Sequence, residues 1–141
     1  MHTNMRYSST GNAVFKLCYH LVIVTKYRRK ILDNNMTEDI IELISNILDK
    51  NGCTLVECNG ESDHVHFLIE TIPTTNLTKI INSIKTVSSR ILRKKYKIAS
   101  LKAGKKVLWS PSYFISTCGE VKIDILKRYI ENQGNLVTPP K

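Results

Sequence analysis

Two histidines separated by one residue, His64 and His66, are the side chains of this sequence best suited to chemistry. They belong to the run 63–70, in which they alternate with apolar residues. In a strand successive side chains point to opposite faces, so both imidazoles would share one face and the apolar residues the other. Imidazole is a common metal ligand, and two rings one pleat apart can bind one divalent cation. A polar outer strand face is the alternative interpretation.

A second candidate pair lies near the C-terminus, where Tyr129 and Gln133 are four residues apart in a predicted helix. This spacing places them on the same helix face. The phenol of Tyr129 could act as a nucleophile, and the amide oxygen of Gln133 could complete a metal site begun by His64 and His66. Such a site would leave a divalent ion with open positions and its full charge, which suits polarisation of a phosphate oxygen. A tyrosine that only packs an amphipathic helix is the alternative.

The chain is basic, with 21 Lys and Arg against 12 Asp and Glu and a net charge of +9. This excess makes a polyanion the first partner to consider. The positive charge gathers in the run 26–30, around an aromatic ring, and in the second half of a predicted helix. A solvated surface is the alternative for each cluster. The candidate phosphate-binding residues are Lys26, Arg28, Arg29, Arg90, Arg93, Lys94 and Lys95.

The order of the predicted elements indicates the fold class. Strand patterns alternate with helical periodicity, and Thr37 is the predicted N-cap of the first helix. The predicted elements are a strand at 14–25, a helix at 37–51, strands at 53–58 and 63–70 around a turn at 59–62, a helix at 76–97, a strand at 107–117 and a helix at 119–133. This is an α+β order, the ferredoxin-like (RRM-like) β-α-β-β-α-β sandwich with a central antiparallel sheet, plus a C-terminal helix that carries the tyrosine.

On this plan the first and third strands are neighbours in the middle of the sheet. His64 and His66 then lie beside the strand that carries His20, which we interpret as a partnered core or interface histidine. The last helix could lie over the histidine face. We expect a flexible leader at 1–12, one domain at 13–134 and a tail at 135–141, and we place the edge or bulge of the sheet at Pro111.

Cysteine usage and hydropathy indicate the compartment. Cys18, Cys53, Cys58 and Cys118 contain no C-x-x-C pair, so we expect reduced thiols and no zinc site. The chain has no apolar run of membrane-spanning length, and residues 1–6 lack the apolar segment of a secretory signal. We therefore expect a cytoplasmic protein with no membrane partner.

From about Val14 to Gln133 the chain resembles the single-tyrosine HUH transposases. These are the small TnpA-type enzymes that mobilise insertion sequences as single-stranded DNA, together with their REP-associated tyrosine transposase relatives. The matching pieces are Tyr19-His20-Leu21-Val22, Thr25-Lys26-Tyr27-Arg28-Arg29, His64-Val65-His66, Ser88-Ser89-Arg90, Trp109-Ser110-Pro111-Ser112-Tyr113-Phe114 and Tyr129-Ile130-Glu131-Asn132-Gln133.

The resemblance implies that His64, His66 and Gln133 bind Mg²⁺ or Mn²⁺ and that Tyr129 is the nucleophile. It implies an enzyme that cleaves and rejoins single-stranded DNA at the hairpin ends of a mobile element, through a 5′-phosphotyrosine intermediate and without ATP. It also implies a homodimer in which the tyrosine helix of one subunit can serve the histidines of the other. Gly119 could be the hinge for this helix or, equally, an ordinary helix-entry turn.

Two other functions are compatible with parts of the pattern. A non-catalytic nucleic-acid-binding module of the same fold would need the basic helix but neither Gln133 nor a metal. A histidine-triad nucleotide hydrolase would use a His-x-His-x-His run, but Leu68 occupies the third histidine position. The hydrolase is therefore disfavoured.

Overall fold

The structure is a computed structural model that describes residues 8–10, 13–15, 17–98, 107–118 and 131. Of the predicted last helix only Glu131 is described, so Tyr129 and Gln133 lie outside the described residues. The predicted hinge at Gly119 also lies outside them. The half of the candidate site that the structure describes is therefore the histidine half.

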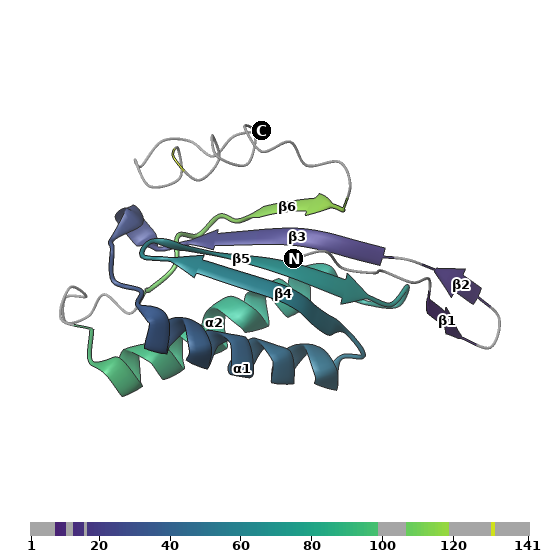
Figure 1. The fold of residues 1–141 in the computed structure, drawn as a ribbon, viewed down its shortest axis with the longest axis horizontal. Coiled ribbons are helices and arrows are strands. Elements are labelled where there is room, and N and C mark those ends of the chain that lie inside the picture. The colour runs from purple at the N-terminus through teal and green to yellow at the C-terminus, as the bar shows by residue number, and fades with distance from the viewer. Residues whose placement is uncertain (1–7, 11–12, 16, 99–106, 119–130, 132–141) are drawn as a thin grey trace.

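The main sheet has four antiparallel strands in the order β4-β5-β3-β6 (Figure 1). Its strands are β3 (Leu17–Val24), β4 (Thr54–Glu61), β5 (His64–Thr71) and β6 (Phe114–Thr117). The first and third strands of the predicted plan, β3 and β5, are neighbours in the middle of the sheet, and this confirms the ferredoxin-like order.

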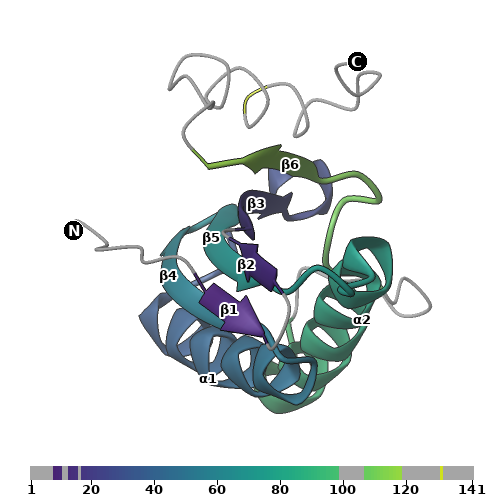
Figure 2. The same cartoon turned by 90° about the vertical axis from the view of Figure 1, so that its right-hand side faces the viewer.

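Two helices, α1 (Asn34–Lys50) and α2 (Leu77–Tyr96), cover one face of this sheet (Figure 2). Asp33 caps α1 by accepting a hydrogen bond from Met36 N, so the prediction of Thr37 as the N-cap was wrong. The side chain of Thr37 instead donates to the Asp33 carbonyl from inside the first turn. The start of α2 is as predicted, because Asn76 accepts from Lys79 N.

The core lies between the helices and one face of the sheet. Alternate residues of β3 and β5 are fully buried there, including Leu21, Ile23 and Phe67, and they pack with helix residues such as Ile44 and Ile84. Each such buried side chain contributes roughly 1.5–3 kcal/mol relative to an exposed one. Because side chains alternate along a strand, this burial directs the intervening residues of β3 and β5 to the opposite face.

The hairpin between β4 and β5 turns at Ser62 and Asp63, and not over 59–62 as predicted. Gly60 lies within β4, opposite Val65, at a point where α1 approaches the strand closely. A Cβ atom at Gly60 would lie 2.9 Å from the Thr37 Oγ1 atom. The glycine therefore permits close helix–strand packing at a position that the sequence pattern had assigned to a turn.

The strands of the structure also begin and end at other residues than predicted. Strand β1 (Ser8–Thr10) pairs with β2 (Ala13–Phe15) in a separate ribbon, so regular structure begins within the expected leader and before Ala13. In the predicted strand 107–117 only β6 is regular. Trp109 makes an isolated bridge with Thr25, and Pro111 separates that bridge from β6.

Cys18 and Cys118 form a disulfide, so the prediction of reduced thiols was wrong for this pair. In the β3–β6 register Tyr19 is opposite Thr117. Cys18 precedes Tyr19 and Cys118 follows Thr117, so the two cysteines meet with their Cα atoms 5.4 Å apart. This separation is typical of a disulfide. The two cysteines are 100 residues apart in the sequence, so only strand pairing brings them together.

Candidate functional site

The three histidines of the central strands gather on the sheet face opposite the helices. His66 pairs with Val22 and His64 with Val24 in the β3–β5 register, and His20, two residues before Val22 in β3, is opposite Leu68. The His20 Nδ1 atom is 2.8 Å from the His66 Nε2 atom, and the two rings stack with their centroids 5.0 Å apart. The predicted arrangement, with His20 as a partnered histidine beside the pair, is confirmed.

Asp63, in the turn before β5, orients His64. Its Oδ1 atom is 2.9 Å from the His64 Nδ1 atom, and its side chain is only 8% exposed. A hydrogen bond from Nδ1–H to this carboxylate leaves Nε2 of His64 as the lone-pair nitrogen. Metal-binding histidines commonly have such a carboxylate partner, which fixes the ring and raises its basicity.

The charges around the histidines suit metal binding. Burial lowers the pKa of His20, and burial together with the neighbouring His20 lowers the pKa of His66, while Glu57 acts in the opposite direction on both. Burial opposes ionisation of Asp63, but hydrogen bonds from His64 and Arg28 outweigh it and hold its pKa below the ordinary value. Near neutral pH His20 and His66 are therefore neutral, as a metal ligand must be, and Asp63 is ionised.

His64 and His66 are the candidate metal ligands among the described residues. Among them, no group of three or more His, Cys, Asp and Glu side chains is arranged to bind a metal ion. With Nδ1–H of His64 bonded to Asp63, the Nε2 atom of His64 carries the lone pair. His66 lies on the same sheet face, but its Nε2 atom contacts His20. The donors present fit a divalent ion if His66 exchanges its contact with His20 for the ion and if a further ligand comes from outside the described residues.

Arg28 contacts both Asp63, beside this histidine face, and Glu131. Its Nε atom donates to the second carboxylate oxygen of Asp63 at 3.0 Å, and its Nη1 atom donates to the Glu131 carbonyl at 3.3 Å. Tyr27 and Arg28 both have positive φ, 61° and 51°, a conformation that costs roughly 1–3 kcal/mol per residue. Glu131 is flanked in the sequence by Tyr129 and Gln133 at two residues each.

The other predicted phosphate ligands have different surroundings. Lys26 and Arg29 lie 5.4 and 5.3 Å from the centre of the Tyr27 ring. Lys95 forms an ion pair with Asp39 at 2.8 Å, which offsets its charge. No described residue forms an ion pair with Arg90, Arg93 or Lys94.

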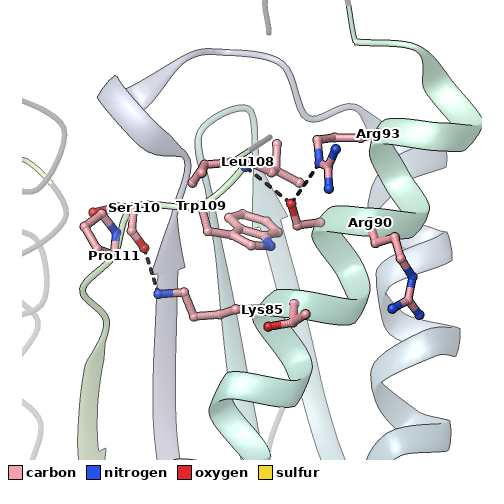
Figure 3. Close-up of a pocket in the computed structure, with 10 residues that line it drawn as sticks. Lys85, Arg90, Arg93, Leu108, Trp109, Ser110 and Pro111 are labelled. Carbon is pink, nitrogen blue, oxygen red and sulfur yellow. Dashed lines mark hydrogen bonds between the residues drawn. The ribbon is translucent and has the colours of Figure 1, made fainter. Parts of the chain in front are cut away.

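A cavity of about 360 Å³ lies between α2 and the segment 107–111 (Figure 3). Three cations of α2 line it, and Trp109 and Leu108 form its buried wall. Its lining includes Lys85, Ser89, Arg90, Arg93, Trp109 and Pro111. Because α2 covers the helix side of the sheet, this cavity is separate from the histidine face.

Comparison with known families identifies the chain. The family model described as "Transposase IS200 like" matches residues 13–133, which is most of the sequence. The chain belongs to the IS200-like transposase family. This assignment confirms the resemblance to the TnpA-type transposases that the sequence motifs indicated.

Individual relatives of this transposase agree with the assignment. It is 29% identical over 120 residues to the ISDra2 transposase TnpA of Deinococcus radiodurans, covering 85% of this chain and 86% of that protein. It is 24% identical over 115 residues to the transposase of insertion sequence IS200 of Salmonella typhimurium, covering 82% of this chain and 75% of that protein.

Two solved structures share the fold of this transposase. A crystal structure of a candidate transposase from Deinococcus radiodurans superimposes with a TM-score of 0.78 at 29% identity, over 89% of this chain and 97% of that one. The structure of a REP-associated tyrosine transposase bound to a REP hairpin superimposes with a TM-score of 0.56 at 13% identity, over 92% of this chain and 76% of that one. The second likeness supports the fold alone.

Sequence reasoning about this transposase missed Asp63 as a partner of His64. The available signal was its position directly before the histidine pair, where a short carboxylate can reach the first ring. Sequence reasoning also left Lys85 and Trp109 out of the candidate sites, since their meeting depends on how 107–111 packs on α2. In the described part of the chain, no helix is long and apolar enough to cross a membrane.

Proposed function

We propose that this transposase cleaves and rejoins single-stranded DNA through a covalent link to Tyr129, with a divalent metal held by His64, His66 and Gln133. The observation that carries the proposal is the Asp63–His64 contact on the same sheet face as His66. A carboxylate-oriented imidazole beside a second, neutral imidazole is the first half of a metal site. The contact from Arg28 to the Glu131 carbonyl supports placing the end of the chain beside it.

The nucleophile must be activated, because a phenol with a pKa near 10 is ionised in only about one molecule in a thousand at neutral pH. When the Tyr129 oxygen attacks phosphorus in line, the bond from phosphorus to the 3′ oxygen breaks. The phenol loses its proton and the leaving 3′ oxygen gains one. The product is a 5′-phosphotyrosine and a free 3′-OH, and attack by another 3′-OH reverses the step without ATP.

Bound Mg²⁺ or Mn²⁺ would polarise the scissile phosphate and offset its developing charge. His64 is held for this role by Asp63, and His66 is neutral and adjacent. Gln133 would supply the neutral third ligand from the C-terminal segment. The protein's own contribution is to fix two rings on a rigid central strand while a separate segment carries the nucleophile.

The proposed substrate is a single strand with hairpin ends, held by the cations of the 26–30 run and of α2. The REP-associated relative is bound to a REP hairpin, and the net charge of +9 suits a polyanion. We further propose one functional domain at 13–134, a homodimer in which the Tyr129 segment of one subunit serves the histidines of the other, and a cytoplasmic location with access to the chromosome.

A covalent-adduct assay tests the mechanism. A labelled single-stranded end of the mobile element should become attached to the wild-type protein in Mg²⁺ or Mn²⁺, and EDTA should abolish attachment. Tyr129→Phe should retain DNA binding and lose the adduct, while Tyr27→Phe and Tyr113→Phe should keep it. An adduct that persists in Tyr129→Phe would contradict the proposal, and DNA binding with no metal-dependent adduct in the wild type would favour the non-catalytic binding module.

Mixed dimers test the composite site. His64→Ala and Tyr129→Phe subunits are each inactive alone on this proposal. If the tyrosine acts on the partner's histidines, a mixture of the two variants regains one intact site per heterodimer and forms the adduct. A mixture as inactive as its components would show that each subunit uses its own tyrosine.

A further inference from the structure

The Cys18–Cys118 disulfide lies on the histidine face of the sheet. Cys18 is two residues before His20 in β3, so both side chains point to the face that also carries His66. In the β3–β6 register Ser116 is opposite His20, and Cys118 follows Ser116 by two residues. The disulfide is therefore the next residue pair to His20 and Ser116 on this face, and the proposed chemistry makes no use of it.

Strand β6 is a short edge strand whose last residues the disulfide fastens to β3. The strand has four residues and forms one edge of the main sheet (Figure 1). Phe114 packs on Val22 and Val24 at its beginning, and the Cys118 N–H donates to the Cys18 carbonyl at 2.9 Å just beyond its end. The ends of edge strands open at a small cost in free energy. Reduction of the disulfide therefore leaves this end of β6 attached by weak contacts alone.

One sulfur of the disulfide is accessible to thiols. A hollow of about 140 Å³ lies beside the bond and is lined by Leu17, Cys18, Tyr19, Thr117 and Cys118. Cys118 is half-buried, whereas Cys18 is only 6% exposed. Because thiol–disulfide exchange begins when a thiolate attacks an accessible sulfur, a reductant reaches the bond through Cys118.

Opening the disulfide is a two-electron exchange with a dithiol reductant. A thiolate of the reductant attacks the Cys118 Sγ atom, and the Cys18 Sγ atom leaves as a thiolate and takes up a proton. The second thiol of the reductant then displaces Cys118, which is also protonated. The protein gains two electrons and two protons, and the dithiol loses them as it becomes a disulfide. A disulfide oxidant, such as oxidised glutathione, drives the reverse reaction.

The disulfide also fixes the point where the chain leaves the sheet towards Tyr129. Cys118 directly precedes the run 119–130, and Glu131 directly follows it. The Glu131 carbonyl accepts from Arg28 at 3.3 Å, so in the oxidised chain both ends of this run are attached to the same subunit. Fixing both ends of a chain reduces the number of positions that the residues between them can reach. Reduction removes the covalent one of these two attachments.

We propose that Cys18 and Cys118 form a reversible redox switch that, when oxidised, slows the joining of DNA strands and leaves their cleavage unchanged. This inference rests on the proposed function, in which Tyr129 first attacks one strand and a second 3′-OH then attacks the phosphotyrosine. Cleavage needs one position of Tyr129, whereas joining must also bring the linked strand to another DNA end. The second attachment restricts that step. In a cytoplasm that keeps thiols reduced the switch is open, and oxidation closes it.

Two measurements on the full chain test the switch. Thiol alkylation read by mass spectrometry, after equilibration in glutathione buffers that span the cytosolic range, should show the Cys18–Cys118 pair passing from oxidised to reduced. With a labelled single-stranded end, an acceptor strand with a free 3′-OH and Mg²⁺, oxidised and reduced wild type should form the Tyr129 adduct equally. The reduced protein should form the joined product several-fold faster.

Cysteine variants provide the controls. Cys118→Ser should join strands at the rate of the reduced wild type in both kinds of buffer, and Cys18→Ser is the second variant if Cys118→Ser does not fold. Cys58→Ser should respond to oxidation as the wild type does, because burial raises the pKa of the Cys58 thiol to about 12 and keeps it out of the exchange. Circular-dichroism melting verifies that each variant is folded.

The switch is overturned if the pair stays oxidised in every one of these buffers, since the disulfide would then be a permanent structural link. It is also overturned if oxidation reduces cleavage and joining in parallel, which indicates general damage to the site. A Tyr129 adduct with joining that is independent of the redox state refutes the switch and leaves the proposed function intact. Absence of the adduct in both redox states refutes the proposed function, and the switch with it.

Discussion

The carboxylate of Asp63 holds the imidazole of His64 through a 2.9 Å contact between Oδ1 and Nδ1. If His64 binds the metal through Nε2, Asp63→Asn should weaken Mn²⁺ binding by about 10- to 100-fold, because the amide lacks the charge that raises the ring's basicity. Calorimetric titration with Mn²⁺ measures the effect. Asp49→Asn, the same change in the exposed last turn of α1, is the matched control, and equal affinity in both variants would argue against this role.

Arg28 and Arg29 are neighbours in the sequence but should respond differently to neutralisation. The charge of Arg28 is offset by Asp63, whereas no described residue forms an ion pair with Arg29. Arg29→Gln should therefore reduce the salt dependence of single-stranded DNA binding by about 0.7 in log–log slope, the value for one phosphate contact, while Arg28→Gln should change it less. Affinities measured over a series of salt concentrations give the slopes. A larger change for Arg28→Gln would support its original prediction as a phosphate ligand.

Acid should destabilise the fold through His20. Burial lowers its pKa below the ordinary value of 6.5, so between that value and the lower folded pKa the unfolded chain binds a proton that the folded chain does not. The free energy of unfolding should therefore fall as the pH drops below about 6.5, with a slope of at most about 1.4 kcal/mol per pH unit from one histidine. Denaturant titrations without metal at several pH values measure this. His20→Gln should flatten the slope, and an unchanged slope would contradict the assignment.

The Cys18–Cys118 disulfide closes a long loop and should stabilise the oxidised chain. Its loss in Cys18→Ser should lower the free energy of unfolding by about 2–4 kcal/mol. Denaturant titration with and without reductant measures the difference, and the reductant should have no effect on Cys18→Ser. Cys58→Ser is the control, because burial raises the pKa of the Cys58 thiol to about 12 and keeps it unreactive. Reductant-independent stability of the wild type would refute the prediction.

The sequence by itself determined the order of the elements and the face of each strand. The apolar alternation around His64 and His66 dictates that both imidazoles leave the core together, since the side-chain period of a strand is two. The same reasoning, applied to the β-α-β-β-α-β order, placed these residues on a central strand next to His20, and the register of β3 and β5 confirms it. The family motifs then indicated a transposase, because a motif is recognised from residue types and their spacing alone.

Tertiary structure decided what depends on approach between distant segments. The contact of His20 with His66, the disulfide of Cys18 with Cys118 and the cavity at Trp109 each join residues far apart in the chain, which no local pattern encodes. Gly60 shows the same limit, since its role follows from the proximity of Thr37 on α1. Asp63 depends on both the sequence and the fold. The sequence places it next to His64, but only the folded turn directs its two carboxylate oxygens to His64 and Arg28.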